Sequence, residues 1–166
     1  MENKNEYQAE LFGNRLAKKY RELRKWARKN RISCYRLYDR DIPEVPVSLD
    51  IYEFLPDDVT SPIECAKFLA EQNERITAND PLVEKEIKAR TYAVLYLYER
   101  PYEKDEKEED EWLELMAQTA AETLGTDPSH IIKKQRKKQK GLNQYEKNDE
   151  TAGPKITGIV QEQGQL

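Results

Sequence analysis

The chain is poor in the residues that build metal, redox and nucleophilic sites. It contains two cysteines and one histidine. Cys34 and Cys65 lie far apart in the sequence, which excludes a CxxC zinc motif and a disulfide framework, so both are expected to be small buried residues. His130 has no second histidine to act with, and we expect it to be structural or exposed.

Motifs that bind nucleotides or carry out hydrolysis are also missing. The six glycines form no GxGxxG, no Walker-type phosphate loop and no GxSxG, and a single histidine rules out HExxH. The sequence therefore predicts no catalytic residue, no metal site and no cofactor-binding residue in this chain. An intact small enzyme would need a cofactor pocket for which the sequence gives no sign.

Long apolar segments are absent as well. Residues 1–10 lack the apolar region of a signal peptide, and no apolar run approaches the roughly 20 residues that span a bilayer. We therefore expect no membrane partner and a cytoplasmic location.

What the chain does have is strongly segregated charge. The net charge is −4, yet nine Lys or Arg residues and a single acid, Glu22, lie between Arg15 and Arg31. A second basic block, residues 133–140, has six cations and no acid, whereas residues 103–111 carry seven acids. Such blocks are commonly solvated faces or flexible arms, but two basic blocks folded onto one surface would hold phosphate.

Hydrophobic spacing predicts the order of the elements. Leu11, Leu16, Leu23 and Ala27 recur at helical spacing, which predicts a basic helix of about 20 residues that ends near residue 30, after a frayed stretch of seven. The expected elements that follow are a strand pair, two helices, a strand, a helix and two strands, at residues 32–39, 47–54, 62–75, 80–88, 91–98, 105–124, 130–135 and 156–161.

Some of these elements carry more specific signals. Residues 47–54 alternate, with Val47, Leu49, Ile51 and Glu53 on one face, and Ser61 with Glu64 three residues later predicts a capped start of the helix that follows. Within 105–124 the residues expected to face inward are Trp112, Leu115, Met116, Thr119 and Ala120, and Gly125 is expected to end that helix.

This order excludes a regular βαβ alternation and indicates an α+β fold, a small mixed or antiparallel sheet covered by helices. We divide the chain into a basic N-terminal helix (1–31), an α+β domain (32–141) with a helical insertion (55–89), and a terminal part (142–166). The terminal part is a loop and the first arm of a hairpin. Because the second arm is missing, either the chain is a fragment of a longer protein or this tail is disordered.

The second basic block continues into a stretch suited to RNA. KKQRKKQKGLNQYEK, residues 133–147, combines six cations in its first eight residues with glutamines and Tyr145. Cations neutralise phosphates, amides read base edges, and an aromatic ring stacks on a base. The alternatives are a solubilising arm or a tail that binds a protein.

At these residues the chain resembles a known family. NRLAKKYRELRKWARKNRISCYRLYDRDIPE, residues 14–44, resembles the segment before the catalytic domain of large-subunit rRNA methyltransferases that use S-adenosylmethionine. The greatest similarity is to the guanine-N7 half of the fused large-subunit guanine methyltransferase. Residues 133–147 resemble that segment's second signature, a basic loop that ends in an Asn-Gln-Tyr-x-Lys run. The resemblance covers residues 14–54 and 90–166 and leaves out the helical insertion.

The resemblance implies a small α+β domain that presents large-subunit rRNA to a Rossmann-like methyltransferase domain. That domain, with its glycine-rich cofactor loop, is absent here, so S-adenosylmethionine belongs to the full-length family and this chain alone should be inactive. Together with the basic block, the resemblance gives an expected RNA-binding set: Arg15, Lys25, Arg28, Arg36, Arg40, Lys133, Lys134, Arg136, Lys138, Lys140, Asn143, Gln144 and Tyr145.

Two other functions stay open from the sequence. A stand-alone RNA- or ribosome-binding module would bind RNA tightly without further sequence. A protein-interaction module would instead use the basic helix to dock an acidic partner, and its RNA binding would be weak.

Overall fold

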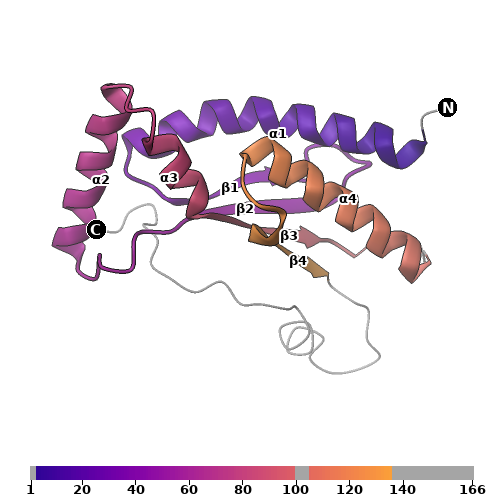
Figure 1. The fold of residues 1–166 in the computed structure, drawn as a ribbon. Coiled ribbons are helices and arrows are strands. Elements are labelled where there is room, and N and C mark those ends of the chain that lie inside the picture. The colour runs from indigo at the N-terminus through magenta and orange to yellow at the C-terminus, as the bar shows by residue number, and fades with distance from the viewer. Residues whose placement is uncertain (1–2, 100–104, 136–166) are drawn as a thin grey trace.

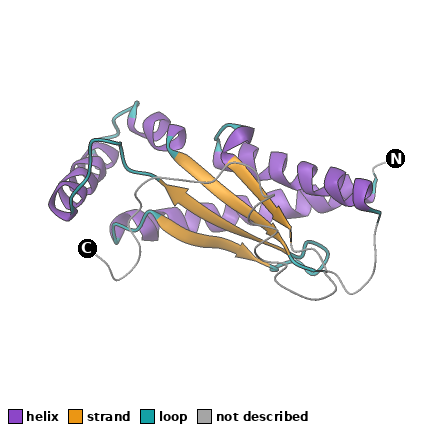
Figure 2. Cartoon of the chain, turned by 90° about the horizontal axis from the view of Figure 1, so that it is seen from below, coloured by secondary structure: helices purple, strands orange, loops and turns teal. Residues whose placement is uncertain are grey.

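The computed structural model describes residues 3–99 and 105–135 of the chain. They form a two-layer α+β fold, in which two long helices lie together over one face of a four-stranded sheet (Figure 1). Figure 2, seen from below, shows the strands in front of these helices. The helices are α1 (Lys4–Lys29), α2 (Pro62–Thr77), α3 (Val83–Ala89) and α4 (Glu106–Leu124), and the strands are β1 (Cys34–Asp39), β2 (Val47–Glu53), β3 (Thr91–Leu97) and β4 (Ile131–Gln135).

The sheet is mixed, which is one of the two arrangements expected from the sequence. Its order is β1-β2-β3-β4, with antiparallel pairs at β1–β2 and β2–β3 and a parallel pair at β3–β4. The parallel pair arises because α4 crosses over the sheet between β3 and β4. Alternation in β2 turns Val47, Leu49 and Ile51 toward α1 and α4, and all three are fully buried. The α+β fold class and the predicted hairpin are therefore confirmed.

Helix α1 begins earlier than the sequence suggested. The side chain of Asn3 accepts a hydrogen bond from the backbone N–H of Glu6 at 2.8 Å, which caps the helix. The expectation that the first seven residues fray was wrong for residues 4–7, because a capped start does not require apolar residues. Phe12, Leu16 and Ala27 lie in the core.

A bulge in β1 decides which of its residues face the core. The pairing with β2 shifts between Arg36 and Tyr38, so Leu37 and Tyr38 are both fully buried although they are neighbours. Tyr35, rather than Cys34, lies on the core side of the strand. Cys34 is only half-buried, which corrects the expectation that it is buried.

Helix α4 buries a wider face than its spacing suggested. Because it packs on both α1 and β4, two ridges are buried: Trp112, Met116, Ala120 and Leu124 in one, and Leu113, Ala117 and Ala121 in the other. Leu115 and Thr119, which were expected to face inward, are half-buried at its edge. Gly125 ends the helix at φ +72°, as its position predicted.

The helical insertion forms α2 and α3, which stand beside one end of the sheet (Figure 1). The side chain of Ser61 caps α2 through Glu64, as expected. Cys65 is buried in a small separate apolar cluster with Leu55, Val59 and Leu69.

His130 ends a short 3-10 helix, Pro128–His130, where the sequence suggested the start of a strand. Its ring lies 3.9 Å from the ring of Tyr92 in a stacked arrangement, and its Nδ1 lies 2.8 Å from the carbonyl oxygen of Thr91. These contacts agree with the structural role expected for it. The predicted strand 156–161 and the loop before it lie outside the described residues.

Candidate nucleic-acid interface

The described part of the chain contains seven of the thirteen residues that the sequence assigned to RNA. These are Arg15, Lys25, Arg28, Arg36, Arg40, Lys133 and Lys134. The other six lie outside the described residues: Arg136, Lys138, Lys140, Asn143, Gln144 and Tyr145.

Arg15 lies on the flank of α1 and pairs with the turn between β1 and β2. Its Nε donates to Oδ2 of Asp41 at 2.9 Å, and Nζ of Lys19 lies 2.9 Å from the same oxygen. Burial by itself would raise the pKa of Asp41, but the hydrogen bonds from Lys19 and Arg15 lower it further than burial raises it. Two cations of α1 are thus partly neutralised by one internal carboxylate.

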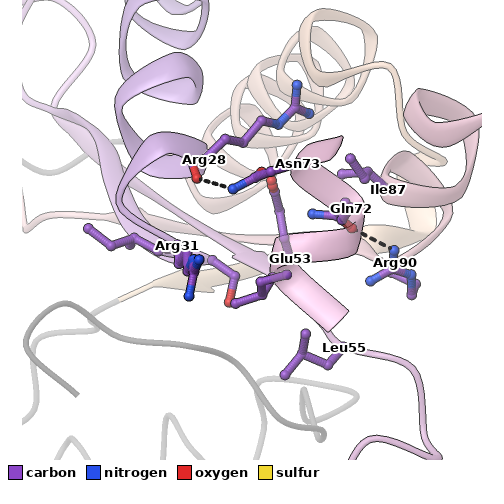
Figure 3. A pocket seen from close by; sticks show the side chains of 11 residues that line it. Arg28, Arg31, Glu53, Leu55, Gln72, Asn73, Ile87 and Arg90 are labelled. Atoms are coloured by element: carbon purple, nitrogen blue, oxygen red, sulfur yellow. Dashed lines mark hydrogen bonds between the residues drawn. The ribbon is translucent and has the colours of Figure 1, made fainter. Parts of the chain in front are cut away.

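Arg28 faces the helical insertion. Its guanidinium donates to both carboxylate oxygens of Glu84, at 2.6 and 3.2 Å. Asn73 donates to the backbone carbonyl of Arg28 at 2.9 Å (Figure 3). The Arg28 side chain is 13% exposed. Its position indicates a role in fastening the end of α1 to α2 and α3.

Arg36 and Arg40 belong to the other face of the sheet. Arg36 forms two hydrogen bonds with Asp50, at 2.7 and 3.2 Å, which outweigh the effect of burial and raise its pKa. The Arg40 guanidinium lies 4.3 Å from the centre of the Tyr98 ring and 3.3 Å from a carboxylate oxygen of Asp39. Both arginines therefore already have internal partners.

Strand β4 divides its two lysines between the faces of the sheet. Lys133 pairs with Glu114 of α4, on the face that α1 and α4 cover. Lys134 is half-buried on the opposite face, in register with Tyr96. The predicted residues are thus distributed over both faces of the sheet.

The structure does bring one group of cations together on α1. Lys18, Arg21, Lys25 and Lys29 follow one another at intervals of three or four residues, so they form a row along one side of the helix. All four are exposed, and none forms an ion pair with another described residue. We call this row the cationic stripe.

Of these four residues, only Lys25 belongs to the RNA-binding set expected from the sequence. The signal that finds the others is their position on the helix, opposite the apolar row that contains Leu16, Tyr20 and Ala27. Counting basic residues did not separate the cations that face solvent from those that face acidic side chains.

A buried polar cluster lies beneath the end of α1. Glu53 is 9% exposed, and its burial raises its pKa in spite of the nearby Arg28. Burial likewise raises the pKa of Tyr20 to about 12, and the hydroxyl groups of Tyr20 and Tyr35 find no hydrogen-bond partner among the described residues. The cavity beside Glu53, drawn in Figure 3, measures about 10 Å³. It has room for roughly one water molecule and is far too small for a cofactor.

Two classes of site find no support in the described residues. No group of three or more His, Cys, Asp or Glu side chains within 3–99 and 105–135 is arranged to hold a metal ion. No helix in the same ranges is long and apolar enough to cross a membrane.

Comparison with known proteins supplies the family. No protein-family model matches the chain. A Legionella pneumophila (strain Lens) protein named ribosomal RNA large subunit methyltransferase K/L is 36% identical over 149 residues, which are 89% of this chain and 16% of that protein. A protein of the same name from Magnetococcus marinus is 30% identical over 156 residues, 94% of this chain and 16% of that protein.

A shorter stretch is more strongly similar. In the protein of the same name from Methylococcus capsulatus, 46 residues are 59% identical, which is 28% of this chain and 6% of that protein. The chain spans about a sixth of the length of the first two relatives. Over about nine-tenths of its own length, the chain is a homologue of one segment of the large-subunit rRNA methyltransferase family.

Proposed function

We propose that this chain is an RNA-contacting segment of an S-adenosylmethionine-dependent large-subunit rRNA methyltransferase. It would present rRNA to a methyltransferase domain elsewhere in the full-length protein, in the cytoplasm. By the resemblance of its two basic signatures, that domain is the guanine-N7 half of the fused enzyme. We assign no catalytic or cofactor-binding residue to this chain, and S-adenosylmethionine would be bound by the methyltransferase domain.

The observation that carries this proposal is the cationic stripe. Its first and last members, Lys18 and Lys29, are eleven residues apart, which corresponds to about 16 Å along an α-helix. A nucleic-acid strand advances about 3.4 Å per nucleotide in a duplex, so the stripe is long enough to meet several phosphates. Since none of the four cations forms an ion pair with another described residue, a phosphate backbone would not have to displace a carboxylate of the described part of the chain to reach them.

Direct measurement of RNA binding tests the proposal. A variant with Lys18, Lys25 and Lys29 changed to Glu reverses the stripe, and fragments of large-subunit rRNA are titrated at several salt concentrations. Wild-type affinity should fall steeply between about 50 and 200 mM salt, as expected when several phosphates are neutralised. The variant should lose at least about ten-fold in affinity and show a shallower dependence on salt.

A matched control variant uses three lysines elsewhere on the surface. Lys67, Lys85 and Lys107 are exposed lysines on α2, α3 and α4, and changing these three to Glu alters the net charge by the same amount. The control should keep near-wild-type affinity if the stripe is the contact surface. If both triple variants lost the same amount of RNA affinity, the loss would be a general effect of net charge, and the proposal would be contradicted.

The same stripe would also suit an acidic protein partner, and the titration separates the two functions. If the stripe binds an acidic protein, wild-type RNA binding should be weak and should not change in the stripe variant. A flat salt dependence together with such weak binding would replace the RNA proposal by a protein-docking one.

A further inference from the structure

An exposed tryptophan lies beside the cationic stripe. Trp26 is 39% exposed, whereas the other tryptophan of the chain, Trp112, is fully buried. Trp112 is held in the core by a hydrogen bond from its indole N–H to Oε1 of Gln8 at 2.9 Å. Only one of the two large indole rings therefore contributes to the core.

The position of Trp26 on α1 relates it to the stripe. At 100° per residue, its direction from the helix axis differs by about 60° from that of Lys29, three residues later. Lys25 is its immediate neighbour in the chain. Trp26 thus flanks the last two turns of the stripe, on the side where Arg15 and Lys19 also lie.

Packing in the core accounts for the positions of the residues near Trp26, but it does not account for the exposure of Trp26 itself. Tyr20 and Ala27 are buried and Leu23 is packed against the core, so the apolar side of this part of α1 is complete without it. A single exposed apolar side chain is common on protein surfaces. A ring beside Lys25 and Lys29, which form no ion pair with another described residue, is a more specific arrangement. Single-stranded nucleic acid is bound by cations that hold phosphates and by rings that stack on bases.

We propose that Trp26 stacks on an unpaired base of an RNA whose phosphates lie along the cationic stripe. This inference rests on the proposed function and narrows its substrate class to looped or single-stranded RNA. Bases inside a regular duplex are already stacked on each other and offer no free face to an indole ring, whereas the bases of loops, bulges and ends do.

The test uses two RNA hairpins that differ only in their loops. One carries unpaired adenosines and the other has abasic sugars at the same positions, so that both have the same phosphates. Wild type should bind the adenosine loop roughly ten-fold more tightly, because a base that stacks on an aromatic side chain adds to the affinity. Trp26→Ala should remove this difference, and Trp26→Phe should keep part of it.

Tryptophan fluorescence gives a second readout of the same contact. Because Trp112 is buried, a decrease in emission on addition of the adenosine hairpin reports on Trp26. The decrease should be absent with the abasic hairpin, and it should vanish in Trp26→Phe. The unchanged emission of Trp112 in the Trp26 variants shows that they are folded.

The outcomes distinguish the failure of this inference from that of the proposed function. If Trp26→Ala binds both hairpins as wild type does, or weakens both equally, base stacking is overturned while phosphate binding by the stripe stands. The stripe variant should weaken both hairpins equally. Failure of wild type to bind either hairpin overturns the stacking and the proposed function together.

Discussion

Arg28 and Glu84, 56 residues apart in the sequence, form a two-point ion pair that fastens the basic helix to the helical insertion. The two hydrogen bonds measure 2.6 and 3.2 Å. The Nε atom of Arg28 is buried and has no acceptor among the described residues, so the two hydrogen bonds of this guanidinium go to Glu84. The insertion is thus tied to the end of α1 next to Trp26 and Lys29.

Removing one partner of this pair should cost stability. Glu84→Gln leaves the Arg28 charge largely buried, and we expect a loss of about 1–2 kcal/mol in the free energy of unfolding, a modest value because Glu84 is 40% exposed. Unfolding in urea measures this loss of free energy. The double variant Arg28→Met/Glu84→Gln should recover part of the loss, since no buried charge is left unpaired. Additive losses in the double variant would show that the two side chains are not coupled.

Glu53 should make stability fall as the pH rises. Its folded-state pKa lies above the ordinary 4.5 because it is buried, so the folded chain binds a proton that the unfolded chain has already released. Its contribution is complete below pH 4.5 and is lost as the pH rises through the folded pKa. Glu53→Gln should therefore match wild type near pH 4 and exceed it increasingly toward pH 7, as unfolding in urea at several pH values would show. A constant difference between the two proteins would disprove this.

Asp41 restrains two cations that could otherwise add to RNA binding. Asp41→Asn frees Arg15 and Lys19 and removes one negative charge near the stripe, which should raise RNA affinity by roughly five-fold, equivalent to about 1 kcal/mol. The stability cost should stay below about 1 kcal/mol, since both pairs are partly exposed. Asp58→Asn removes an exposed charge outside α1 and serves as the matched control. An equal gain in the control would attribute the effect to net charge alone.

Gly125 should resist replacement by residues with a Cβ atom. Its φ of +72° is unfavourable for alanine, and a Cβ there would approach the Lys88 side chain to 3.0 Å. Gly125→Ala should lower the free energy of unfolding by about 1–2 kcal/mol. Gly125→Asn, which tolerates a positive φ better, should cost less, provided that Lys88 can move aside. Thermal unfolding of both variants tests this order, and an equal loss would point to crowding by Lys88 as the cause.

For the described residues, the sequence by itself determined the fold class and the order of the main helices and strands. The alternation in β2, the capping residues Ser61 and Gly125, and the helical spacing in α1 are local patterns, and each leads to the structure it predicted. Local patterns suffice here because helix and strand periodicity depends on residues only a few positions apart. The same patterns missed the bulge at Leu37 and the cap at Asn3, which depend on strand pairing and on a single polar side chain.

The tertiary structure alone decided which cations face solvent. Arg15, Arg28 and Arg36 meet Asp41, Glu84 and Asp50, acids that lie 26, 56 and 14 residues away in the sequence. No periodicity encodes those pairings, because they depend on how α1, the insertion and the sheet pack together. Charge counting could identify α1 as basic, but only the packing of the fold separated the cationic stripe from the arginines that stabilise the chain.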